Sequence, residues 1–567
     1  MVSGRIEAAP APALRPPHTV MRLARMGAAF ATRLSFKRVL LRRLARENWR
    51  FDCPVWDLDH EGFGTAVLSV EGPERRYALV VFTADLPADQ RTDRVIAEAW
   101  DATFTLHDGI PDQAEIARLA GETPRQEAGR FGPRDLVLGR ANRSMRLFES
   151  VVAALAAGRQ PELEALTRVG YLMRTTAVYG SGKFGCADRD RLEERPELRG
   201  SFQVEMLAVY LFRWFTILLI EHLARCRGGS AAVALSPARA RHLGIGNATG
   251  LGMAPFLVRH PALLDRWARL RETALARVRA LPEADPASRD RFLTLLARAR
   301  RHVACWQVDD AVQQERIDGL RDDLADLADL DLADLLARPF PWDGLHRLAE
   351  ARYGLEAQEL LLSLLLEPQG ARIDDLAEAQ WARERDDLDP AMTVGELREG
   401  LRAHYSWALE PEGEPDAEAD RRFWYYSEEK LEPRLGWRGR EPGADLAMPL
   451  GNADNARRLH AALERTGGKE TAGQVSLRHP ELRHALRRLQ AVMRQPYAEV
   501  HDDLESAAMR PIDLLRFKLA QFGATGFDPR SDLWTRITLF QGAPQPGELD
   551  PESADDWAFP VPPEEGS

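Results

Sequence analysis

Apolar residues recur at intervals of three and four positions through most of the chain after residue 140, and this spacing constrains the fold more than any other feature. It places apolar side chains on one face of a helix and therefore predicts helices. The clearest examples are residues 144–157, 162–174, 202–225, 261–281 and 288–308. Strands and helices do not alternate in the manner of βαβ units, so we expect neither a Rossmann fold nor a TIM barrel.

Strand signals concentrate before this helical stretch. Residues 65–70 and 76–82 are rich in β-branched and apolar side chains and flank a Gly-Pro turn, which predicts an antiparallel hairpin. Residues 102–106 predict a third strand. Because a two-stranded ribbon is marginally stable by itself, the sheet needs a helical cover. We therefore expect a mainly α protein of the α+β class, with a large helical body and a small N-terminal antiparallel β unit.

Composition divides the 567-residue chain into five parts. Ala and Pro dominate the beginning, acidic residues and Pro dominate the end, and glycine-rich stretches interrupt the helices in between. The expected parts are a disordered tail over residues 1–20, a basic helix with the hairpin unit over 21–135, a helical core with glycine-rich loops over 136–345, a second helical region over 346–541 with a loop-rich insertion at 405–460, and an acidic, Pro-rich tail over 542–567.

The formal net charge is −11, so overall charge does not favour nucleic-acid binding, and no specific nucleic-acid partner is expected. Residues 1–50 are basic, unlike the chain as a whole, with eleven Lys and Arg and only two acidic residues. The segment 21–50 is typical of a basic amphipathic helix. Such a helix could serve as a transit-like peptide, bind a membrane surface or an anionic partner, or dock on the acidic remainder of the same chain. We favour docking within the chain.

The most apolar stretch, residues 204–220, contains Glu205 and Arg213. A membrane-spanning helix needs about 20 nearly uncharged residues, so this stretch predicts the central helix of a helical core, and no membrane span is expected. Four widely spaced cysteines make no disulfide framework, and no secretory signal is evident, so we expect a cytoplasmic location. The abundance of Arg, Ala, Leu and Gly is typical of GC-rich bacterial genes.

A first glycine-rich stretch covers residues 174–185 and is expected to break the helix that precedes it. Free backbone N–H groups in such a loop can cradle an anion. Phe184 stands where a nucleotide-binding P-loop needs Ser or Thr, and no strand is expected before the loop, so it is not a P-loop. The alternative is a simple helix end with a tight turn. The predicted anion-binding residues are Arg174, Gly180, Ser181 and Gly182, and the predicted proton-transfer residues are Tyr179 and Lys183.

A second glycine-rich stretch covers residues 244–252 and precedes a predicted helix start near Pro255. A glycine-rich turn before a helix N-terminus suits a phosphate or a carboxylate. The predicted substrate-binding residues here are Gly246, Asn247 and Thr249, with Asn247 able to polarise a carbonyl group. The alternative is a hinge between buried helices.

A third stretch, residues 423–436, gathers aromatic and charged side chains within a few positions. Neighbouring aromatics can half-bury such charges, and the pKa of a half-buried Tyr or Lys can shift enough for acid–base chemistry. The alternative is a surface network of ion pairs. Tyr425 and Lys430 are predicted to move a proton, and Arg434 is predicted to bind the substrate.

Lysine occurs only five times against 71 arginines. A buried lysine can lose its proton and an arginine cannot, so the few lysines are stronger functional candidates than the many arginines.

We expect a soluble enzyme that acts on a small carboxylate or phosphate metabolite by proton transfer, as a lyase or isomerase, with the three stretches converging on one pocket. The alternative is a non-catalytic helical scaffold or partner-binding protein that uses its basic N-terminal arm. No metal site is expected; the cofactor, the substrate and assembly into a homo-oligomer stay open.

Overall fold

The computed structural model describes residues 13–87, 99–125, 132–180, 195–249, 253–258, 260–378, 388–409, 422–427, 432–437, 451–502, 504, 510–531 and 534–564. The chain forms two compact units and passes between them several times. Unit 1 comprises Met1–Phe30, Gly250–Ala284 and Asp331–Lys518, and unit 2 comprises Ala31–Thr249, Asp285–Leu330 and Leu519–Ser567.

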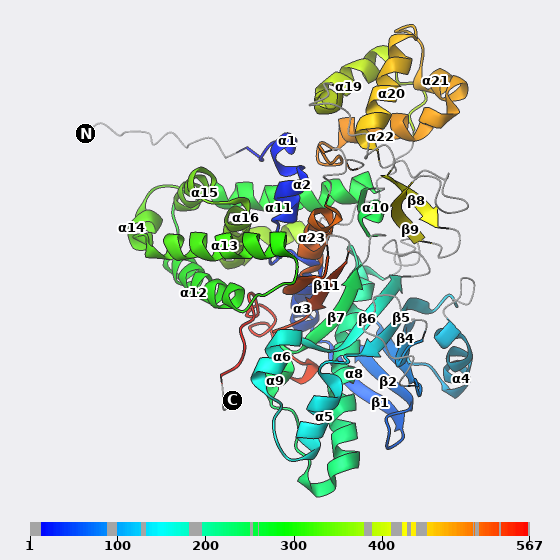
Figure 1. Cartoon of the computed structure of the whole chain (residues 1–567), viewed down its shortest axis with the longest axis vertical. Coiled ribbons are helices and arrows are strands. Elements are labelled where there is room, and N and C mark those ends of the chain that lie inside the picture. The colour runs from blue at the N-terminus through cyan, green and yellow to red at the C-terminus, as the bar shows by residue number, and fades with distance from the viewer. Residues whose placement is uncertain are drawn as a thin grey trace. The chain divides into compact units, whose positions relative to one another are not determined.

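A nine-stranded sheet organises unit 2, with strand order β1-β2-β3-β4-β5-β6-β7-β11-β10 (Figure 1). Neighbouring strands are antiparallel except for β6 and β7, which are parallel. The strands are β1 (Arg50–Leu58), β2 (Gly64–Glu71), β3 (Arg76–Thr83), β4 (Ala102–Asp108), β5 (Asp135–Arg143), β6 (Tyr171–Gly180), β7 (Gly244–Thr249), β10 (Gly526–Pro529) and β11 (Thr535–Leu539).

The sheet corrects the expected fold class. The predicted hairpin and third strand are confirmed as β2, β3 and β4, but they belong to one large mixed sheet and not to a small N-terminal unit. The helix expected over residues 162–174 ends at Val169, and β6 begins two residues later. Gly170 ends that helix with a positive φ of 77°, which glycine adopts without strain. The β-branched and aromatic residues of this stretch, Tyr171, Thr175, Thr176, Val178 and Tyr179, favour a strand, and pairing with β5 and β7 holds it extended.

Helix α8 (Gln203–Gly228) forms the core of unit 2 and packs against the sheet (Figure 1). Its Phe212 ring stacks on Phe104 of β4 at a centroid distance of 4.4 Å. Arg213 is 1% exposed and donates hydrogen bonds to backbone carbonyls, among them those of Leu243 (2.7 Å) and Ala543 (2.9 Å). These backbone carbonyl groups replace water around the buried Arg213 guanidinium. The stretch Gln203–Ala231 is long and apolar enough to cross a membrane, yet 89% of its apolar window is buried within the protein.

Unit 2 has further helices besides α8, and the C-terminal segment 540–564 is tied by charge to one of them, α3 (Phe36–Arg46), and to Arg33 just before it. Asp555 of that segment lies 3.2 Å from Arg33, 3.7 Å from Arg38 and 3.6 Å from Arg42. These ion pairs confirm the interpretation that the basic N-terminal segment docks on acidic parts of the same chain. The helices are α3 (Phe36–Arg46), α4 (Gln113–Glu122), α5 (Phe148–Ala156), α6 (Leu163–Val169), α9 (Pro237–His242), α12 (Pro286–Ala304) and α13 (Ala311–Asp329).

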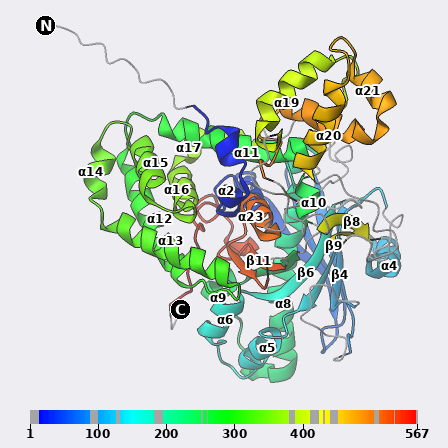
Figure 2. The ribbon, with the colours of Figure 1, turned by 45° about the horizontal axis from the view of Figure 1, so that its top comes forward.

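Unit 1 is helical apart from the hairpin of β8 (Arg422–Ser427) and β9 (Glu432–Trp437) (Figure 2). Its helices are α1 (Pro17–Val20), α2 (Leu23–Gly27), α10 (Met253–Val258), α11 (Pro261–Arg279), α14 (Leu332–Ala337), α15 (Pro341–Arg352), α16 (Leu355–Leu366), α17 (Gly370–Ile373), α18 (Asp375–Glu378), α19 (Val394–Leu409), α20 (Asn452–Glu464), α21 (Ala472–Arg478) and α22 (Arg483–Arg494). Helix α23 (Pro511–Phe522) contains the last passage of the chain between the units.

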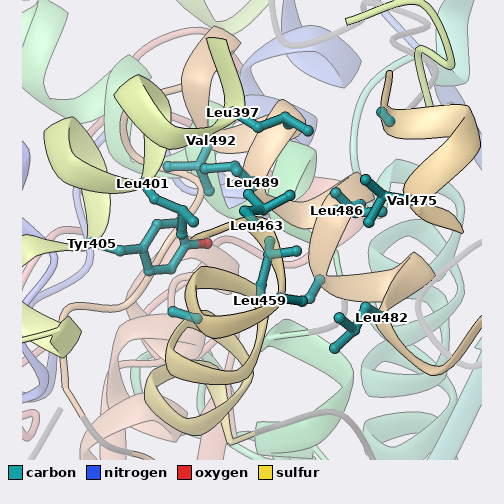
Figure 3. Packing of buried hydrophobic residues seen from close by; sticks show 14 of the residues in the cluster. Leu397, Leu401, Tyr405, Leu459, Leu463, Val475, Leu482, Leu486, Leu489 and Val492 are labelled. Atoms are coloured by element: carbon teal, nitrogen blue, oxygen red, sulfur yellow. The ribbon is translucent and has the colours of Figure 1, made fainter. Parts of the chain in front are cut away.

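Helices α19 to α22 share a leucine-rich core (Figure 3). Leu401 of α19, Leu463 of α20 and Leu489 of α22 are at most 1% exposed within it. The polar edge of this core centres on Glu499, which accepts hydrogen bonds from Tyr405 (2.6 Å) and Asn452 (2.8 Å). Asn452 belongs to one of two Gly-Asn-Ala sequences in the chain, and its role here is structural.

Candidate functional site

The structure brings two of the three predicted stretches together. The stretch 174–185 leaves β6 and the stretch 244–252 leaves β7, and these strands are parallel neighbours, with Thr175 opposite Asn247. Their carboxyl ends therefore lie at the same edge of the sheet, where α/β proteins often bind ligands. The third stretch, 423–436, forms the β8–β9 hairpin of unit 1, in which Tyr425 is directly opposite Arg434.

Both glycine-rich stretches differ locally from what the sequence predicts. A strand, β6, leads into the first stretch, and the second stretch begins as strand β7 and not as a turn. The glycines of β7 serve close packing. A Cβ at position 246 would lie 2.7 Å from the Tyr171 ring, and one at position 244 would collide with the Leu539 carbonyl of β11. Pairing on both sides holds this stretch extended.

Two of the predicted residues, Asn247 and Gly246 of β7, are hydrogen-bonded to Thr175 of β6. Asn247 Nδ2 donates to Thr175 Oγ1 at 2.7 Å, and Thr175 Oγ1 donates to the Gly246 carbonyl at 3.3 Å. Arg174 is 3% exposed. For the predicted residues Tyr179, Gly180, Thr249, Tyr425 and Arg434 the structure describes the strand backbone, whereas Ser181, Gly182, Lys183 and Lys430 lie outside the described residues.

A cavity of about 870 Å³ opens at the other end of β6, entirely within unit 2. Its walls come from segments far apart in the sequence: α6 and the start of β6, the end of α9, the end of α12, the β10–β11 hairpin, and residues 560–562 of the C-terminal segment. Of the residues predicted from the sequence that the structure describes, none lines it. Sequence reasoning missed this site because no single segment carries a recognisable motif.

One wall of the cavity is charged. Asp528 of β10 pairs in register with Arg536 of β11, and Arg530 Nη2 lies 2.6 Å from Asp528 Oδ2 and also pairs with Asp309. Burial raises the pKa of Asp528, although Arg530 opposes the shift. Arg146 Nη2 donates to the Tyr171 hydroxyl at 3.4 Å. Counted together, the cavity lining holds four arginines (146, 168, 530 and 536) and three carboxylates (164, 309 and 528), an excess of one positive charge.

A second wall holds two buried histidines. His242 is 4% exposed, and neither of its ring nitrogens makes a well-formed hydrogen bond among the described residues, although the Val561 backbone lies close enough to act as a weak acceptor. Burial lowers its pKa to about 4, against a smaller opposing effect of the Val561 backbone. His302 Nδ1 donates to the Pro560 carbonyl at 2.6 Å, and burial lowers the pKa of His302 to about 4 as well. Both imidazoles are therefore neutral near pH 7.

Aromatic rings form the rest of the lining. Trp306 follows α12, and its ring meets Phe527 of β10 nearly at right angles, with centroids 5.4 Å apart and an interplanar angle of 83°. His302, one helical turn earlier, contacts the Trp306 ring at 5.2 Å. Trp306 and Phe527 are both half-buried and line the cavity, so their rings are accessible from it.

A cluster of metal-ligand type lies elsewhere in unit 2. His107, Glu115 and Asp135 bring their ligand atoms within 4.8 Å of one another. Arg118 Nη2 already lies 2.6 Å from Glu115 Oε1 and 3.0 Å from Asp135 Oδ1. The Arg118 guanidinium in this position supplies the positive charge that a cation would bring, and it joins the three groups in an ion-pair network.

No protein-family model, no curated protein and no solved structure matches the chain. The site itself defines a class of chemistry: a polar cavity with excess positive charge, two neutral imidazoles and an accessible pair of aromatic rings. Such a site suits a small organic anion, since concave sites with a few convergent polar groups are the usual places for small ligands.

Proposed function

We propose that the protein is an enzyme that acts on a small anionic metabolite by proton transfer, and that the metabolite binds in the arginine-lined cavity of unit 2. The observation that carries the proposal is the position of His242. It is a buried, neutral imidazole whose weak contact of hydrogen-bond type is to the Val561 backbone, and it lines a cavity with excess positive charge. A buried titratable group with a shifted pKa beside a cavity that could take a ligand is a candidate for function.

The chemistry follows from these groups. The arginines bind a carboxylate or a phosphate through charge-assisted hydrogen bonds. A bound anion raises the pKa of the nearby imidazole, because a negative charge favours the protonated ring. His242 can then accept a proton from the metabolite and return it at another atom, which is the step that lyases and isomerases need. Lys183 and Tyr179 of the first glycine-rich stretch, and Tyr425 and Lys430 of the stretch 423–436, stay predictions from the sequence.

Thermal unfolding with a panel of carboxylates and phosphates tests the proposal. A ligand that binds only the native state stabilises it by about 2.7 kcal/mol at 100 times its Kd, so the melting temperature rises. Arg168→Met should reduce the rise, because Arg168 lines the cavity, is exposed and has no ion pair among the described residues, so its loss spares the fold. Arg338→Met, which alters an exposed Asp334–Arg338 pair in unit 1, is the matched control.

Replacement of His242 separates binding from catalysis. His242→Asn should keep the ligand-induced rise in melting temperature and abolish turnover of whichever panel member proves to be the substrate, because the base is lost while the arginines remain. A panel in which no anion raises the melting temperature, or in which Arg168→Met and Arg338→Met behave alike, would contradict the proposal.

A further inference from the structure

The cavity has two chemically different sides, and a simple anion would use only one of them. Arg536 is 8% exposed and lies on the charged side, while Trp306 and Phe527 form the aromatic side. A volume of about 870 Å³ is in the range that holds a ligand of tens of atoms. Phosphate or acetate alone would leave most of this volume and the whole aromatic side without contacts.

The aromatic side has the geometry of a notch for a planar ring. Trp306 and Phe527 meet at 83° with centroids 5.4 Å apart, so a third ring that stacks on one of them presents its edge to the other. Aromatic rings favour these two arrangements, offset stacking and edge-to-face contact. Both rings are half-buried, and the cavity side is where a ligand can cover them.

His242 adds a directional requirement. Its neutral ring carries one N–H donor and one lone-pair acceptor, and the Val561 backbone can serve only the donor. A ligand that fills the cavity without offering a hydrogen-bonding atom would leave the acceptor buried and unpaired, which is unfavourable. A donor group on the ligand ring, or a polar substituent next to it, satisfies this acceptor.

On the basis of the proposed function, we propose that the ligand is a planar aromatic or heteroaromatic ring that carries a carboxylate or a phosphate. The ring lies against Trp306 and Phe527, the acid group binds Arg536 and Arg168, and a polar atom of the ligand meets His242. Carboxylate and phosphate share this chemistry, and the arms of the test below distinguish them.

Cys305 supplies a local readout for the test. It lines the cavity and its side chain is exposed, whereas Cys226, also exposed, lies on α8 away from the cavity lining. Burial raises the pKa of the Cys305 thiol, so alkylation of the full chain is run at about pH 8.5, where an ordinary thiol is half ionised. Mass spectrometry of the peptides gives the alkylation rate of each cysteine, with Cys226 as the internal reference.

Matched probes then isolate the contribution of the ring. Phenyl phosphate is compared with inorganic phosphate, and indole-3-acetate with acetate, at equal concentrations. We expect at least one ring-bearing anion to slow alkylation of Cys305 at a tenfold or more lower concentration than its ringless partner, with Cys226 unaffected. Trp306→Leu should remove this advantage and leave the weak effect of the ringless anion unchanged, and Arg168→Met should weaken both.

Two results overturn the inference in distinguishable ways. Equal protection of Cys305 by the ring-bearing and ringless anions would refute the aromatic requirement while leaving the proposed anion-binding function intact. No protection by any of the four probes, together with no rise in melting temperature, would refute both. If Trp306→Leu perturbs the fold, Phe527→Leu provides the same comparison from the other ring.

Discussion

In unit 1, Glu359 is completely buried among three arginines, whereas in unit 2 three basic side chains are buried with few partners. Arg15 lies 2.8 Å from Glu359, Arg25 lies 2.7 Å from it, and Arg271 pairs with its other oxygen. Arg15 also binds Glu272 through two hydrogen bonds of 2.8 and 2.7 Å. Burial by itself would raise the pKa of Glu359, but the three arginines outweigh it and hold the pKa well below its usual value.

The basic groups of unit 2 are His242, His302 and Lys37. Lys37 is 1% exposed, and its Nζ has no hydrogen-bond partner among the described residues and lies 4.7 Å from the centre of the Trp557 ring. Burial, with smaller contributions from Arg38 and Arg213, holds the pKa of Lys37 well below its usual value. The two histidines are neutral near pH 7 for the same main reason.

The contrast separates two uses of buried polar groups. A cluster of opposite charges such as that of Glu359 fixes one arrangement of the helices around it, and its members are charged at all ordinary pH values. A buried base costs stability, and a fold keeps such a cost where a ligand or a reaction needs the group. Unit 1 also holds buried histidines with lowered pKa values, about 3 for His346 and about 4 for His501. We place the function in unit 2 because its buried histidines, His242 and His302, line a cavity.

The largest effect is expected from Glu359→Gln. The substitution removes the charge that balances Arg15, Arg25 and Arg271 while keeping the shape of the side chain. Removing one partner of a buried ion pair typically costs about 3–5 kcal/mol, so the free energy of unfolding of unit 1 should fall by that amount. Urea titration followed by circular dichroism measures the loss, and hydrogen exchange of α16 peptides assigns it to unit 1.

An exposed pair in the same unit is the control. Asp334 and Arg338 are 56% and 61% exposed, and surface pairs are worth about 0–1 kcal/mol. Asp334→Asn should therefore change stability by less than about 1 kcal/mol. Equal losses for the two variants would show that the Glu359 cluster does not hold unit 1 together.

The second effect is a loss of stability in weak acid. The pKa of His242 and of His302 falls from 6.5 in the unfolded chain to about 4 in the fold. Between these values the unfolded chain binds protons that the folded chain does not, so stability is complete above pH 6.5 and falls as the pH decreases toward 4. Each pKa unit is worth about 1.4 kcal/mol, so each histidine contributes on the order of 3 kcal/mol to this fall.

A single variant tests the assignment. His242→Leu should reduce the dependence of unfolding free energy on pH by about 1.4 kcal/mol per pH unit between pH 6 and 4.5, because one proton fewer is taken up on unfolding. Urea titrations of the two proteins at several pH values give the slopes. Parallel curves for His242→Leu and the parent chain would mean that His242 is not a buried neutral base.

The sequence predicts the contiguous elements well and the site poorly, for physical reasons. The β2–β3 hairpin and α8 carry their own patterns, β-branched runs around a Gly-Pro turn and a long apolar helix. Strand β7 is decided by pairing with neighbours far away in the chain, and Gly246 appears in β7 because Tyr171 packs against it. Local sequence does not contain that information.

The cavity is harder still to predict, since each wall comes from a different part of the chain. His302, Arg536 and His242 stand in three unrelated segments, and none of them has a sequence neighbour that marks it. The scarcity of lysine gives a partial signal. Of the three lysines that the structure describes, Lys37 and Lys518 are each 1% exposed, as expected if the few lysines occupy places unsuited to arginine.

The third test replaces Lys37, and here the free energy of unfolding is expected to rise instead of fall. Lys37→Met should raise the free energy of unfolding by about 1 kcal/mol, because it removes an unpaired polar atom from the interior and keeps the volume. Lys37→Arg should lower it, since a guanidinium keeps its charge when buried and the Lys37 stem already packs against Gly523. Thermal and urea unfolding of the two variants give the changes in stability. A loss of stability in Lys37→Met would mean that Lys37 Nζ has a hydrogen-bond partner in the folded protein.

The smallest change in stability is expected for the hydrogen-bonded pair Asn247 and Thr175, which lies at the second glycine-rich stretch. Asn247 is half-buried and bonded to Thr175, so Asn247→Ala and Thr175→Val should each cost about 1 kcal/mol of stability, the usual net value of one hydrogen bond. The double variant should cost little more than Thr175→Val alone, because that substitution already removes the bond shared with Asn247 as well as the longer bond to the Gly246 carbonyl. Ligand-induced protection of Cys305 should be unchanged in all three variants, since Asn247 does not line the cavity.

The opposite outcome is that Asn247→Ala leaves stability intact and reduces turnover. Asn247 would then act in the reaction, and the catalytic site would lie at the edge of the sheet where β6 and β7 end.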